Sequence, residues 1–496
     1  MNLRGRFACF ASARIRGSVR SSYVRPCLWA GVLLLAVGSA FAQPVGDPVP
    51  RNAQAEAVFE EGLQAFESED YAAAYLDFRV VYEQYAVHRK TTAALLMAGK
   101  ALYRNRDYAG AVELLTAFLR DYPTSGYREA AGRTLGFAQQ KHREDELRSN
   151  AIHLGIALPL SANDEPLTQD LFNGVRLAVN AYNQTAMRPV RMTFRDTRNT
   201  EEGARQAVTA LANAGVDVII GPLYSDEAEA AAGTADREQV VLVPPLATEE
   251  AVAQGRRFVF QANPTITMRG AVMARLAVDD LRLRQVGVAA ESGNSISERM
   301  AEGFQEEALR RGGEVAFFEL LSGARDWVQL PDLVGHDALA SVDALYLPIH
   351  RDNDRDAHRL IEETLRNLAA VASPPRLLGG SKWRDVAFTR QASTFGVVYA
   401  DDFYVDDARS EVLTFKRTYR ELAEGEQPGR LAYVGYDVAR YLIRHLTSAS
   451  RETLADVLRE ADLYEGLGMR IKFNRDNTNE AMFFIEYADG AARLLR

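Results

Sequence analysis

Two patterns of apolar residues divide the chain. From residue 55 to about residue 148, apolar side chains recur every three or four positions, which is the period of amphipathic helices. From Ala151 onward, short apolar runs alternate with helical stretches, which is typical of a parallel sheet covered by helices. The charged segment 141–150 lies between the two patterns. The sequence therefore predicts an all-α domain over residues 55–148, followed by an α/β part.

The helical region repeats itself. Residues that recur at a spacing of 37 positions are Gly62, Tyr71 and Ala74, then Gly99, Tyr108 and Ala111, and finally Gly136. This pattern resembles tetratricopeptide repeats with a slightly longer unit. Small residues at fixed positions let paired helices approach closely, so we expect two helical hairpins and a final helix. A solenoid this short is marginal alone, and two interpretations stay open: a protein-docking module and a structural spacer.

The N-terminus has the pattern of a secretory signal peptide. Residues 1–26 carry six arginines and no acid, an apolar run follows from Leu28 to Val37, and Ala40-Phe41-Ala42 forms a small-x-small cleavage site. We therefore predict a signal peptide over residues 1–42 and a proline-containing linker over residues 43–54. A mitochondrial transit peptide and a start codon placed too early are the alternatives. The apolar run is short for an uncleaved membrane anchor.

Both cysteines, Cys9 and Cys27, lie in the expected signal peptide. The mature chain would then hold no disulfide, thiolate metal site or cysteine nucleophile. Val24-Arg25-Pro26 before Cys27 does not resemble a lipoprotein processing site, so we expect a periplasmic or secreted protein without a lipid anchor. Without the six arginines, 52 basic residues face 67 acidic ones, a net charge of −15 that argues against nucleic acid. No later apolar stretch approaches about 18 residues, so no direct membrane insertion is expected.

One stretch of the α/β part predicts a ligand-facing edge. A strand over residues 216–220 stops at Gly221-Pro222, and Tyr224 and Ser225 begin the next helix, with Ser225 as its expected N-cap. A second buried strand, residues 240–243, leads into a loop that carries Ala247 and Thr248. Because the carboxyl ends of parallel strands share one edge, both loops should emerge where small ligands bind in open α/β sheets.

The alternation of strands and helices starts twice, which predicts two doubly wound sheets and a chain that crosses between two lobes. A terminal hairpin is expected to pair residues 469–473 with residues 481–487 through Asp476-Asn477. Strands are expected at 152–158, 190–195, 216–220, 240–243 and 258–261, and then at 286–290, 315–319, 344–349, 376–379 and 396–399. Helices are expected at 171–182, 200–214, 297–311, 328–333, 354–371, 409–424, 431–446 and 453–463.

Eight short motifs in this part, in order, carry a resemblance. They are Gly155-Ile-Ala-Leu-Pro-Leu-Ser161, Asn173-Gly174 to Asn180, Arg195-Asp196-Thr197, Gly221-Pro222-x-x-Ser225, Val243-Pro244-Pro245-Leu-Ala-Thr248, Phe260 to Pro264, Tyr433-Val-Gly-Tyr436-Asp437, and Tyr464-Glu-Gly466 leading to Asn474. With these motifs the region from Ala151 to Arg496 is similar to type I periplasmic binding proteins, specifically the branched-chain amino acid-binding (leucine-binding) family. The implied architecture is an α/β two-lobe fold preceded by tetratricopeptide-like helical repeats.

The resemblance implies a hinged receptor. Lobe one would comprise residues 151–262 and 404–467, and lobe two residues 263–403 and 468–496, with crossovers near 262–267, 401–405 and 466–470. Members of the family hold an amino acid's carboxylate with hydroxyls and backbone N–H groups of the first lobe, and its ammonium with a carboxylate of the second. The implied ligand-binding residues are Ser161, Tyr224, Ser225, Ala247 and Thr248 in lobe one, and His350, Ser381 and Trp383 in lobe two.

Lobe two departs from the family pattern. Ser381-Lys382-Trp383 stands where an acidic anchor is expected, and Ile349-His350-Arg351 where an aromatic residue is expected. A ligand ammonium would lack its counter-charge, so a free amino acid fits less well. His350, Arg351 and Lys382 would suit an acidic ligand if they faced the cleft. In the simpler interpretation they are solvated loop residues, and Ser225 and Thr248 are an ordinary helix cap and loop hydroxyl.

The favoured interpretation is a secreted, non-enzymatic solute-binding protein of the ABC-transporter type. It would capture a small polar ligand, amino acid-like or acidic, and engage a membrane transporter or another envelope partner. The alternative is a ligand-independent envelope regulator, because repeats followed by this fold also resemble the lipoprotein activators of peptidoglycan synthases. No cofactor or metal is expected: the chain has no Gly-x-Ser-x-Gly, His-Glu-x-x-His or phosphate-loop motif. The adjacent acids Asp401 and Asp402 would point to opposite faces of a strand.

Overall fold

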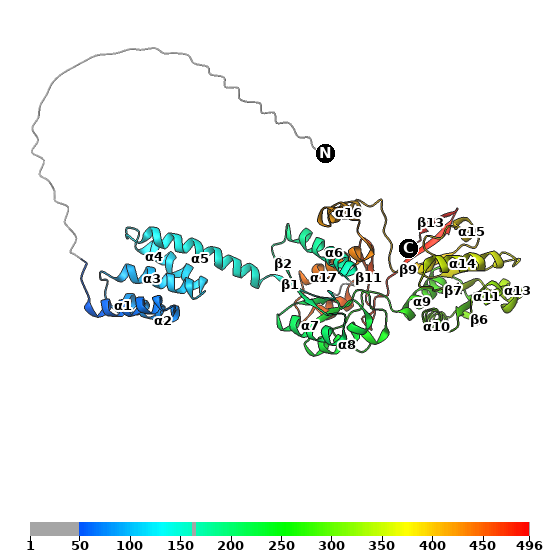
Figure 1. The fold of residues 1–496 in the computed structure, drawn as a ribbon, viewed down its shortest axis with the longest axis horizontal. Coiled ribbons are helices and arrows are strands. Elements are labelled where there is room, and N and C mark those ends of the chain that lie inside the picture. The colour runs from blue at the N-terminus through cyan, green and yellow to red at the C-terminus, as the bar shows by residue number, and fades with distance from the viewer. Residues whose placement is uncertain (1–48, 161–164, 496) are drawn as a thin grey trace, which may run out of the picture. The chain divides into compact units, whose positions relative to one another are not determined.

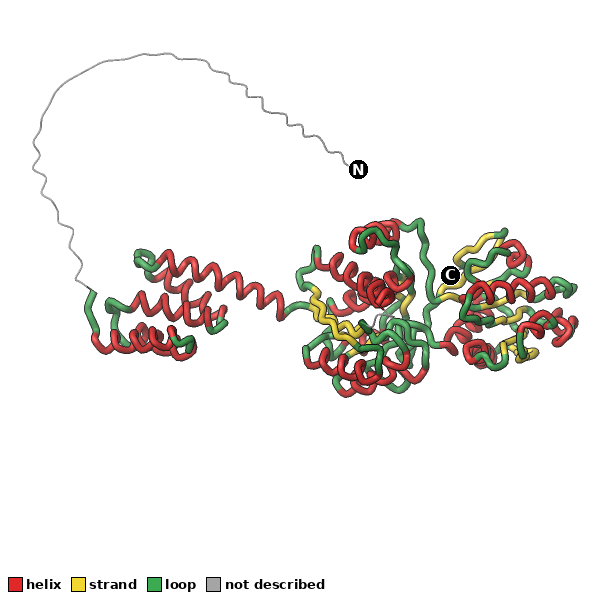
Figure 2. Tube along the Cα trace, in the orientation of Figure 1, coloured by secondary structure: helices red, strands yellow, loops and turns green. Residues whose placement is uncertain are grey.

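A computed structural model describes residues 49–160 and 165–495, and the chain forms two compact units. The first unit ends at Gln139 and the second begins at Gln140. Figures 1 and 2 show the first as helices only and the second as strands and helices together. The expected signal peptide, most of the linker and the candidate Ser161 lie outside the described residues.

The first unit consists of two helical hairpins and a final helix, as the repeat predicted. The helices are α1 (Ala53–Glu67), α2 (Tyr71–Glu83), α3 (Thr91–Arg104), α4 (Tyr108–Asp121) and α5 (Arg128–Ser149), whose last turns belong to the second unit. The repeat extends to the helix caps. Asp70 accepts a hydrogen bond from the backbone N–H of Ala73 at 3.0 Å, and Asp107 accepts one from Gly110 at 2.9 Å. The second helix of each hairpin therefore starts in the same way.

The recurring glycines differ in what they face, which gives a test of the repeat. A Cβ atom on Gly99 would lie 2.5 Å from the buried side chain of Leu115, whereas one on Gly136 would meet nothing within 4 Å. We expect Gly99→Ala to lower the free energy of unfolding of this unit by about 1–3 kcal/mol, the usual cost of overpacking. The matched control Gly136→Ala should instead raise it by about 0.5–1 kcal/mol through helix propensity. Hydrogen exchange of α3 and α4 amides in the full chain measures both, and equal effects would contradict the repeat packing.

In the second unit, a four-stranded parallel sheet of order β2-β1-β3-β4 forms what we call the first lobe. Its strands are β1 (Ile152–Leu158), β2 (Val190–Asp196), β3 (Val218–Ile220) and β4 (Val241–Val243). Its helices are α6 (Glu165–Asn183), α7 (Glu201–Asn213), α8 (Ser225–Arg237), the short η1 (Glu250–Val252), and, from later in the chain, α16 (Ser410–Leu422), α17 (Arg430–Leu446) and α18 (Leu454–Glu460). One core cluster joins β-strand residues such as Ile156 to Val438 and Leu442 of α17. The chain therefore returns to this lobe, as Figure 1 shows for the orange α17 among green and cyan elements.

A seven-stranded sheet of order β13-β12-β9-β8-β7-β5-β6 forms the second lobe. Its parallel strands are β5 (Gln285–Glu291), β6 (Glu314–Leu321), β7 (Ala344–Leu347), β8 (Arg376–Gly379) and β9 (Val398–Asp401), and β12 (Phe483–Ala488) and β13 (Ala491–Leu494) join it antiparallel. Its helices are α9 (Ile266–Arg275) with the π-turn η2 (Leu276–Asp280), α10 (Ser295–Arg310), α11 (Ala324–Val328), α12 (Leu330–Val334), α13 (His336–Ser341), α14 (Asp354–Leu368), η3 (Ser381–Trp383) and α15 (Thr389–Thr394). Two core clusters cover the two faces of this sheet, so its inner strands β5, β7, β8, β9 and β12 are apolar on both sides, whereas the edge strand β13 is exposed.

One expected strand pairing is wrong, and one expected strand is reduced to isolated bridges. Residues 481–487 do not pair with 469–473: β12 pairs with β9 and with β13, and Arg470–Ile471 (β11) pairs with Tyr464–Glu465 (β10). The chain does turn at Asp476-Asn477, but only the bridge between Phe473 and Asn479 flanks this turn. The hairpin of β12 and β13 turns at Asp489-Gly490, where both residues have positive φ, +54° and +78°. An Asp-Gly pair is the usual sequence of such a two-residue turn, and this signal was present in the sequence. The expected strand 258–261 forms no named strand: it makes two isolated bridges, Val259 with Leu242 and Gln261 with Thr478.

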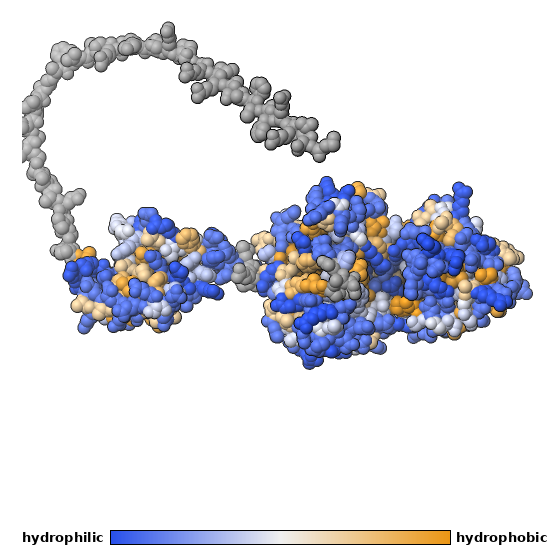
Figure 3. Space-filling view, viewed as in Figure 1, coloured by the Kyte–Doolittle hydropathy of each residue, from blue (hydrophilic) through white to orange (hydrophobic). Residues whose placement is uncertain are grey.

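The visible surface is largely hydrophilic, with small apolar patches (Figure 3). Among the residues that the structure describes, no helix combines the length and the apolar character needed to cross a membrane.

Candidate functional site

A cavity of about 250 Å³ lies between the two lobes. Its wall takes Thr248 from the loop after β4 in the first lobe, and His350 and Ser381 from the loops after β7 and β8 in the second. These positions follow from the parallel sheets, whose carboxyl edges face each other across the lobes. The complete lining is Thr248, Ile266, Arg269, Ile296, Met300, His350, Gly380, Ser381, Ala400 and Met482. The cavity therefore combines an apolar wall with a few polar groups, as small-molecule sites do.

Three of the candidate residues, Thr248, His350 and Ser381, meet at this cavity. Ser225 lies one hydrogen bond away, because its Oγ accepts from the backbone N–H of Thr248 at 3.1 Å. Ser225 is not the N-cap of α8: Tyr224 holds that position, and Ser225 is the first helical residue. The loops that carry Ser225 and Thr248 are thus joined by a hydrogen bond. The backbone N–H of Thr248, which could have bound a ligand anion, already donates to Ser225.

The remaining candidates do not line the cavity. Ala247 is buried, and its carbonyl oxygen accepts a hydrogen bond from Gln261 at 3.2 Å. Tyr224 is half-buried against the first-lobe core. Trp383 is fully buried in a second-lobe core cluster, where its ring occupies the space left by the missing side chain of Gly379. The expectation of Trp383 as a cleft residue is therefore wrong.

The cations suggested for an acidic ligand are already paired. Arg351 forms an ion pair with Glu291, with Nη2 and Oε1 2.6 Å apart, and Lys382 Nζ lies 2.5 Å from a carboxylate oxygen of Asp354. Both side chains behave as loop residues that neutralise nearby acids. Neither Arg351 nor Lys382 lines the cavity between the lobes.

Sequence reasoning did not identify Arg269, the cationic group on the cavity wall. Arg269 lies in α9, and its Nη2 donates to Asp402 at 2.7 Å. Asp402 also pairs with Arg430 at 2.8 Å, and the neighbouring Asp401 pairs with Arg384 through two hydrogen bonds. The apolar wall was also missed, because its members are ordinary core-type residues in a helix or strand: Ile266, Ile296, Met300, Ala400 and Met482.

Burial and charge set the protonation of these groups. Burial disfavours the charge of Asp402, but Arg269, Arg430 and Arg384 outweigh it and hold its pKa well below the ordinary value. Burial raises the pKa of Asp401 to about 6 although Arg384 opposes the rise, so Asp401 is also ionised at neutral pH. Burial, with Lys382 nearby, lowers the pKa of His350. The imidazole is therefore neutral at neutral pH, able to accept one hydrogen bond and donate another.

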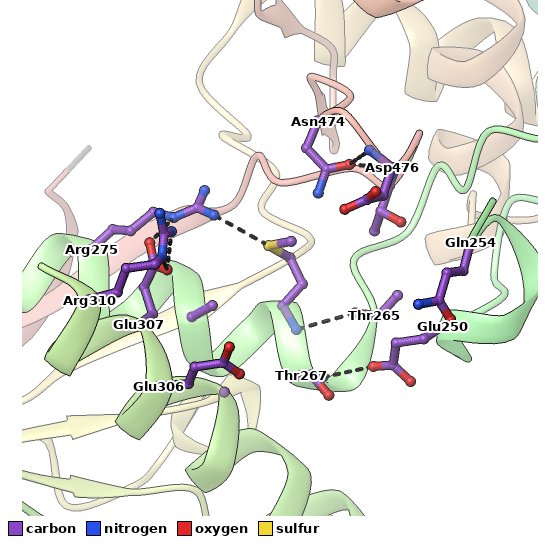
Figure 4. Close-up of a pocket in the computed structure, with 14 residues that line it drawn as sticks. Glu250, Gln254, Thr265, Thr267, Arg275, Glu306, Glu307, Arg310, Asn474 and Asp476 are labelled. Atoms are coloured by element: carbon purple, nitrogen blue, oxygen red, sulfur yellow. Dashed lines mark hydrogen bonds and ion pairs between the residues drawn. The ribbon is translucent and has the colours of Figure 1, made fainter. Parts of the chain in front are cut away.

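Two larger hollows lie nearby, one lined by second-lobe residues alone and the other by residues of both lobes. One, of about 480 Å³, opens at the ends of β5 and β7 and shares His350 and Ile296 with the cavity. The other, of about 520 Å³, is shown in Figure 4. Its two arginines, Arg275 and Arg310, both bind Glu307, so they are already satisfied.

Within the described residues, no group of three or more metal-ligating acids, histidines or cysteines is found.

An ion pair joins the lobes beside the cavity. Arg299 of α10, in the second lobe, binds Glu249 with Nη1 and Oε2 2.9 Å apart, and it also binds Glu250 of η1, in the first lobe. Arg299 follows Ile296 and precedes Met300, which both line the cavity. The chain's own side chains therefore hold the two walls of the cavity together.

Family comparisons agree with this architecture. Residues 151–329 match a family described as periplasmic binding protein, and residues 51–151 match one described as outer membrane lipoprotein. No curated protein matches the chain significantly.

Solved structures share the fold of the second unit. A Rhodospirillum rubrum protein described as a branched-chain amino acid ABC transporter is 22% identical, covering 70% of this chain and 100% of that one, with a TM-score of 0.58. ABC transporter substrate-binding proteins from Desulfitobacterium hafniense (20% identical, 70% of this chain and 100% of that one) and Sphaerobacter thermophilus (18%, 69% and 96%) each give a TM-score of 0.51. The resemblance and the fold predicted from the sequence are confirmed: a type I periplasmic binding protein fold preceded by tetratricopeptide-like helices.

Proposed function

We propose that residues 151–495 act as a solute-binding protein of the ABC-transporter type, which captures a small polar ligand between its lobes. The observation that carries this proposal is the cavity of about 250 Å³ whose wall is shared by Thr248 of the first lobe and by His350 and Ser381 of the second. A ligand that touches both lobes stabilises the closed arrangement, which is how hinged receptors respond to binding.

The wall has groups that suit such a ligand. The hydroxyls of Thr248 and Ser381 and the neutral imidazole of His350 can each donate or accept a hydrogen bond. Ile266, Ile296, Met300 and Met482 provide an apolar surface for the body of the ligand. The Arg299 pairs with Glu249 and Glu250 would strengthen closure from outside the cavity.

The rest of the chain suits an envelope location. With residues 1–42 removed as a signal peptide, the protein would reside in the periplasm or be secreted, and would deliver its ligand to a membrane transporter. The repeats of residues 53–149 would dock a protein partner. No enzymatic step is part of this proposal.

A thermal-shift screen tests ligand binding directly. Amino acids, organic acids, amides and sugars are offered to the full mature chain, and a ligand at a hundred times its dissociation constant should stabilise the protein by about 2.7 kcal/mol. Thr248→Ala is expected to weaken binding about tenfold, because it removes one hydrogen bond to the ligand. Thr447→Ala, which removes an exposed hydroxyl of the same lobe, is the control. Unchanged affinity in Thr248→Ala would remove this cavity as the binding site.

The second candidate is a ligand-independent envelope regulator, similar to the activators of peptidoglycan synthases. Two observations favour it: the chain's own side chains join the lobes through Arg299, Glu249 and Glu250, and residues 51–151 match an outer membrane lipoprotein family. A regulator should show no thermal shift across the whole panel and should stimulate a purified synthase in a polymerisation assay. A specific ligand shift together with no stimulation would reject it.

A further inference from the structure

The charges around the cavity are unequal. Among its ten lining residues are one arginine and one histidine, and no aspartate or glutamate. Just behind the wall, the guanidinium groups of Arg269, Arg384 and Arg430 surround the carboxylates of Asp401 and Asp402. Three positive groups against two negative ones leave one positive charge in excess in this cluster. Beside the cavity, Glu249 and Glu250 exceed Arg299 by one negative charge, but none of these three residues lines it. An anion in the cavity would therefore lie against the positive cluster.

Arg269 is the member of the cluster that reaches the cavity. Its Nη2 is occupied by Asp402 and, more weakly, by Asn263 at 3.4 Å. Its Nε is buried and finds no hydrogen-bond partner among the described residues. Buried N–H groups in proteins are almost always paired, and an unpaired one is costly. The guanidinium of Arg269 therefore keeps hydrogen-bonding capacity beyond its contacts with Asp402 and Asn263.

The cavity does not suit a free amino acid. An ammonium group would meet Arg269 and a neutral His350, with no carboxylate on the wall to balance its charge. The groups that could bind a cation on the second lobe, Glu291 and Asp354, are already paired with Arg351 and Lys382. The apolar side chains Ile266, Ile296 and Met300 suit a short hydrocarbon body instead.

We propose that Arg269 binds the carboxylate of a small organic acid that lacks an amino group, and so selects acids over amino acids. This inference rests on the proposed solute-binding function. The sequence led us to expect that the first lobe binds the ligand's carboxylate. In this proposal Arg269 of α9, in the second lobe, binds it, and Thr248 and Ser381 contact the remaining polar atoms of the ligand.

Isothermal titration calorimetry with three probes of one carbon skeleton tests the selection. The probes are leucine, 4-methyl-2-oxopentanoate and 4-methylpentanoate, which differ in carrying an ammonium, a ketone or a hydrogen next to the carboxylate. The two acids are expected to bind at least tenfold more tightly than leucine. Leucine binding as tightly as the acids would overturn the inference and leave the solute-binding function intact.

Variants identify the residue responsible. Arg269→Lys keeps a positive charge beside Asp402 but loses the planar guanidinium and its Nε–H, and it should weaken acid binding at least tenfold. Arg417→Lys, an exposed arginine of α16, is the matched control and should bind normally. If Arg269→Lys does not fold, the double variant Arg269→Met, Asp402→Asn removes both charges of the pair together and should also lose acid binding. Unchanged acid binding in a folded variant overturns the role of Arg269.

Failure of this inference can be told apart from failure of the proposed function. If amides, sugars or amino acids in the broader screen bind and the acids do not, only the inference fails. If no compound in either set binds, both the inference and the solute-binding function fail.

Discussion

Gly174→Ala is expected to unfold the first lobe or to destabilise it by more than about 3 kcal/mol. Gly174 lies in α6 where this helix crosses α17, and a Cβ atom there would lie 2.0 Å from the carbonyl oxygen of Ala432. The contact is reciprocal, because a Cβ atom on Gly435 of α17 would lie 2.1 Å from the carbonyl oxygen of Leu171. Backbone atoms cannot move aside as a side-chain tip can, so the two helices must separate along a buried interface.

A helical glycine with more room is the control. At Gly233 in α8, an added Cβ would come no closer than 3.4 Å, to the flexible end of Arg256, so Gly233→Ala should be neutral or slightly stabilising. Trp327 and Trp383 lie in a core cluster of the second lobe, so their fluorescence follows that lobe, whereas far-UV circular dichroism sums the helices and strands of the whole chain. Equal stability of the two glycine variants in urea would contradict the close packing of α6 and α17.

The second lobe also has a pair of helices packed through reciprocal glycines. A glycine-to-alanine change there should destabilise the second lobe instead of the first. A Cβ on Gly270 of α9 would lie 1.8 Å from the carbonyl oxygen of Met300, and one on Gly303 of α10 would lie 2.2 Å from that of Thr267. Each lobe thus holds one pair of helices through reciprocal glycines. Gly270→Ala is therefore expected to lower both the fluorescence and the circular dichroism transitions, whereas Gly174→Ala should lower a circular dichroism transition and leave the fluorescence transition in place.

The elements that the sequence predicted are those with strong local signals. The buried strand β1 and the helix α7 were predicted within a residue or two, because a continuous apolar run and a helical period are both readable without tertiary contacts. The C-terminal pairing was wrong because β-pairing is non-local. Residues 481–487 had several possible partners, and β9 lies far away in the sequence. Only the Asp489-Gly490 turn marked the true hairpin locally.

The candidate site divides in a similar way. Thr248, His350 and Ser381 could be located because each follows a strand, and strand ends meet at one edge whatever the packing behind them. Trp383 could not be distinguished from them, because its burial depends on the space above Gly379. Arg269 was missed for the opposite reason: a helical arginine is normally a surface residue, and only the fold brings Asp402 beside it.

Asp437→Ala is expected to destabilise the second unit by about 4 kcal/mol or more. Asp437 of α17 is fully buried, and its two oxygens accept hydrogen bonds from Leu467, Gly468 and Met469 at 2.7, 2.8 and 2.9 Å. These N–H groups belong to the segment that leads from the first lobe to the second. Alanine would leave all three buried donors without an acceptor, at about 1–3 kcal/mol each. Asp437→Asn, with a single acceptor oxygen, should fall between alanine and the wild type.

The pH dependence of this penalty provides a second check. Burial raises the pKa of Asp437 from 3.8 to about 6, although the three backbone N–H donors oppose the rise. The folded protein therefore binds this proton more tightly than the unfolded chain, so the linked stability is fully present below about pH 4 and is lost as the pH rises through 6. Alanine cannot take up the proton, and the penalty measured in urea should be larger at pH 5 than at pH 8. A penalty that stays constant or grows toward pH 8 would show that Asp437 does not titrate in this way. A penalty below about 1 kcal/mol at both pH values would show that the segment between the lobes does not depend on Asp437.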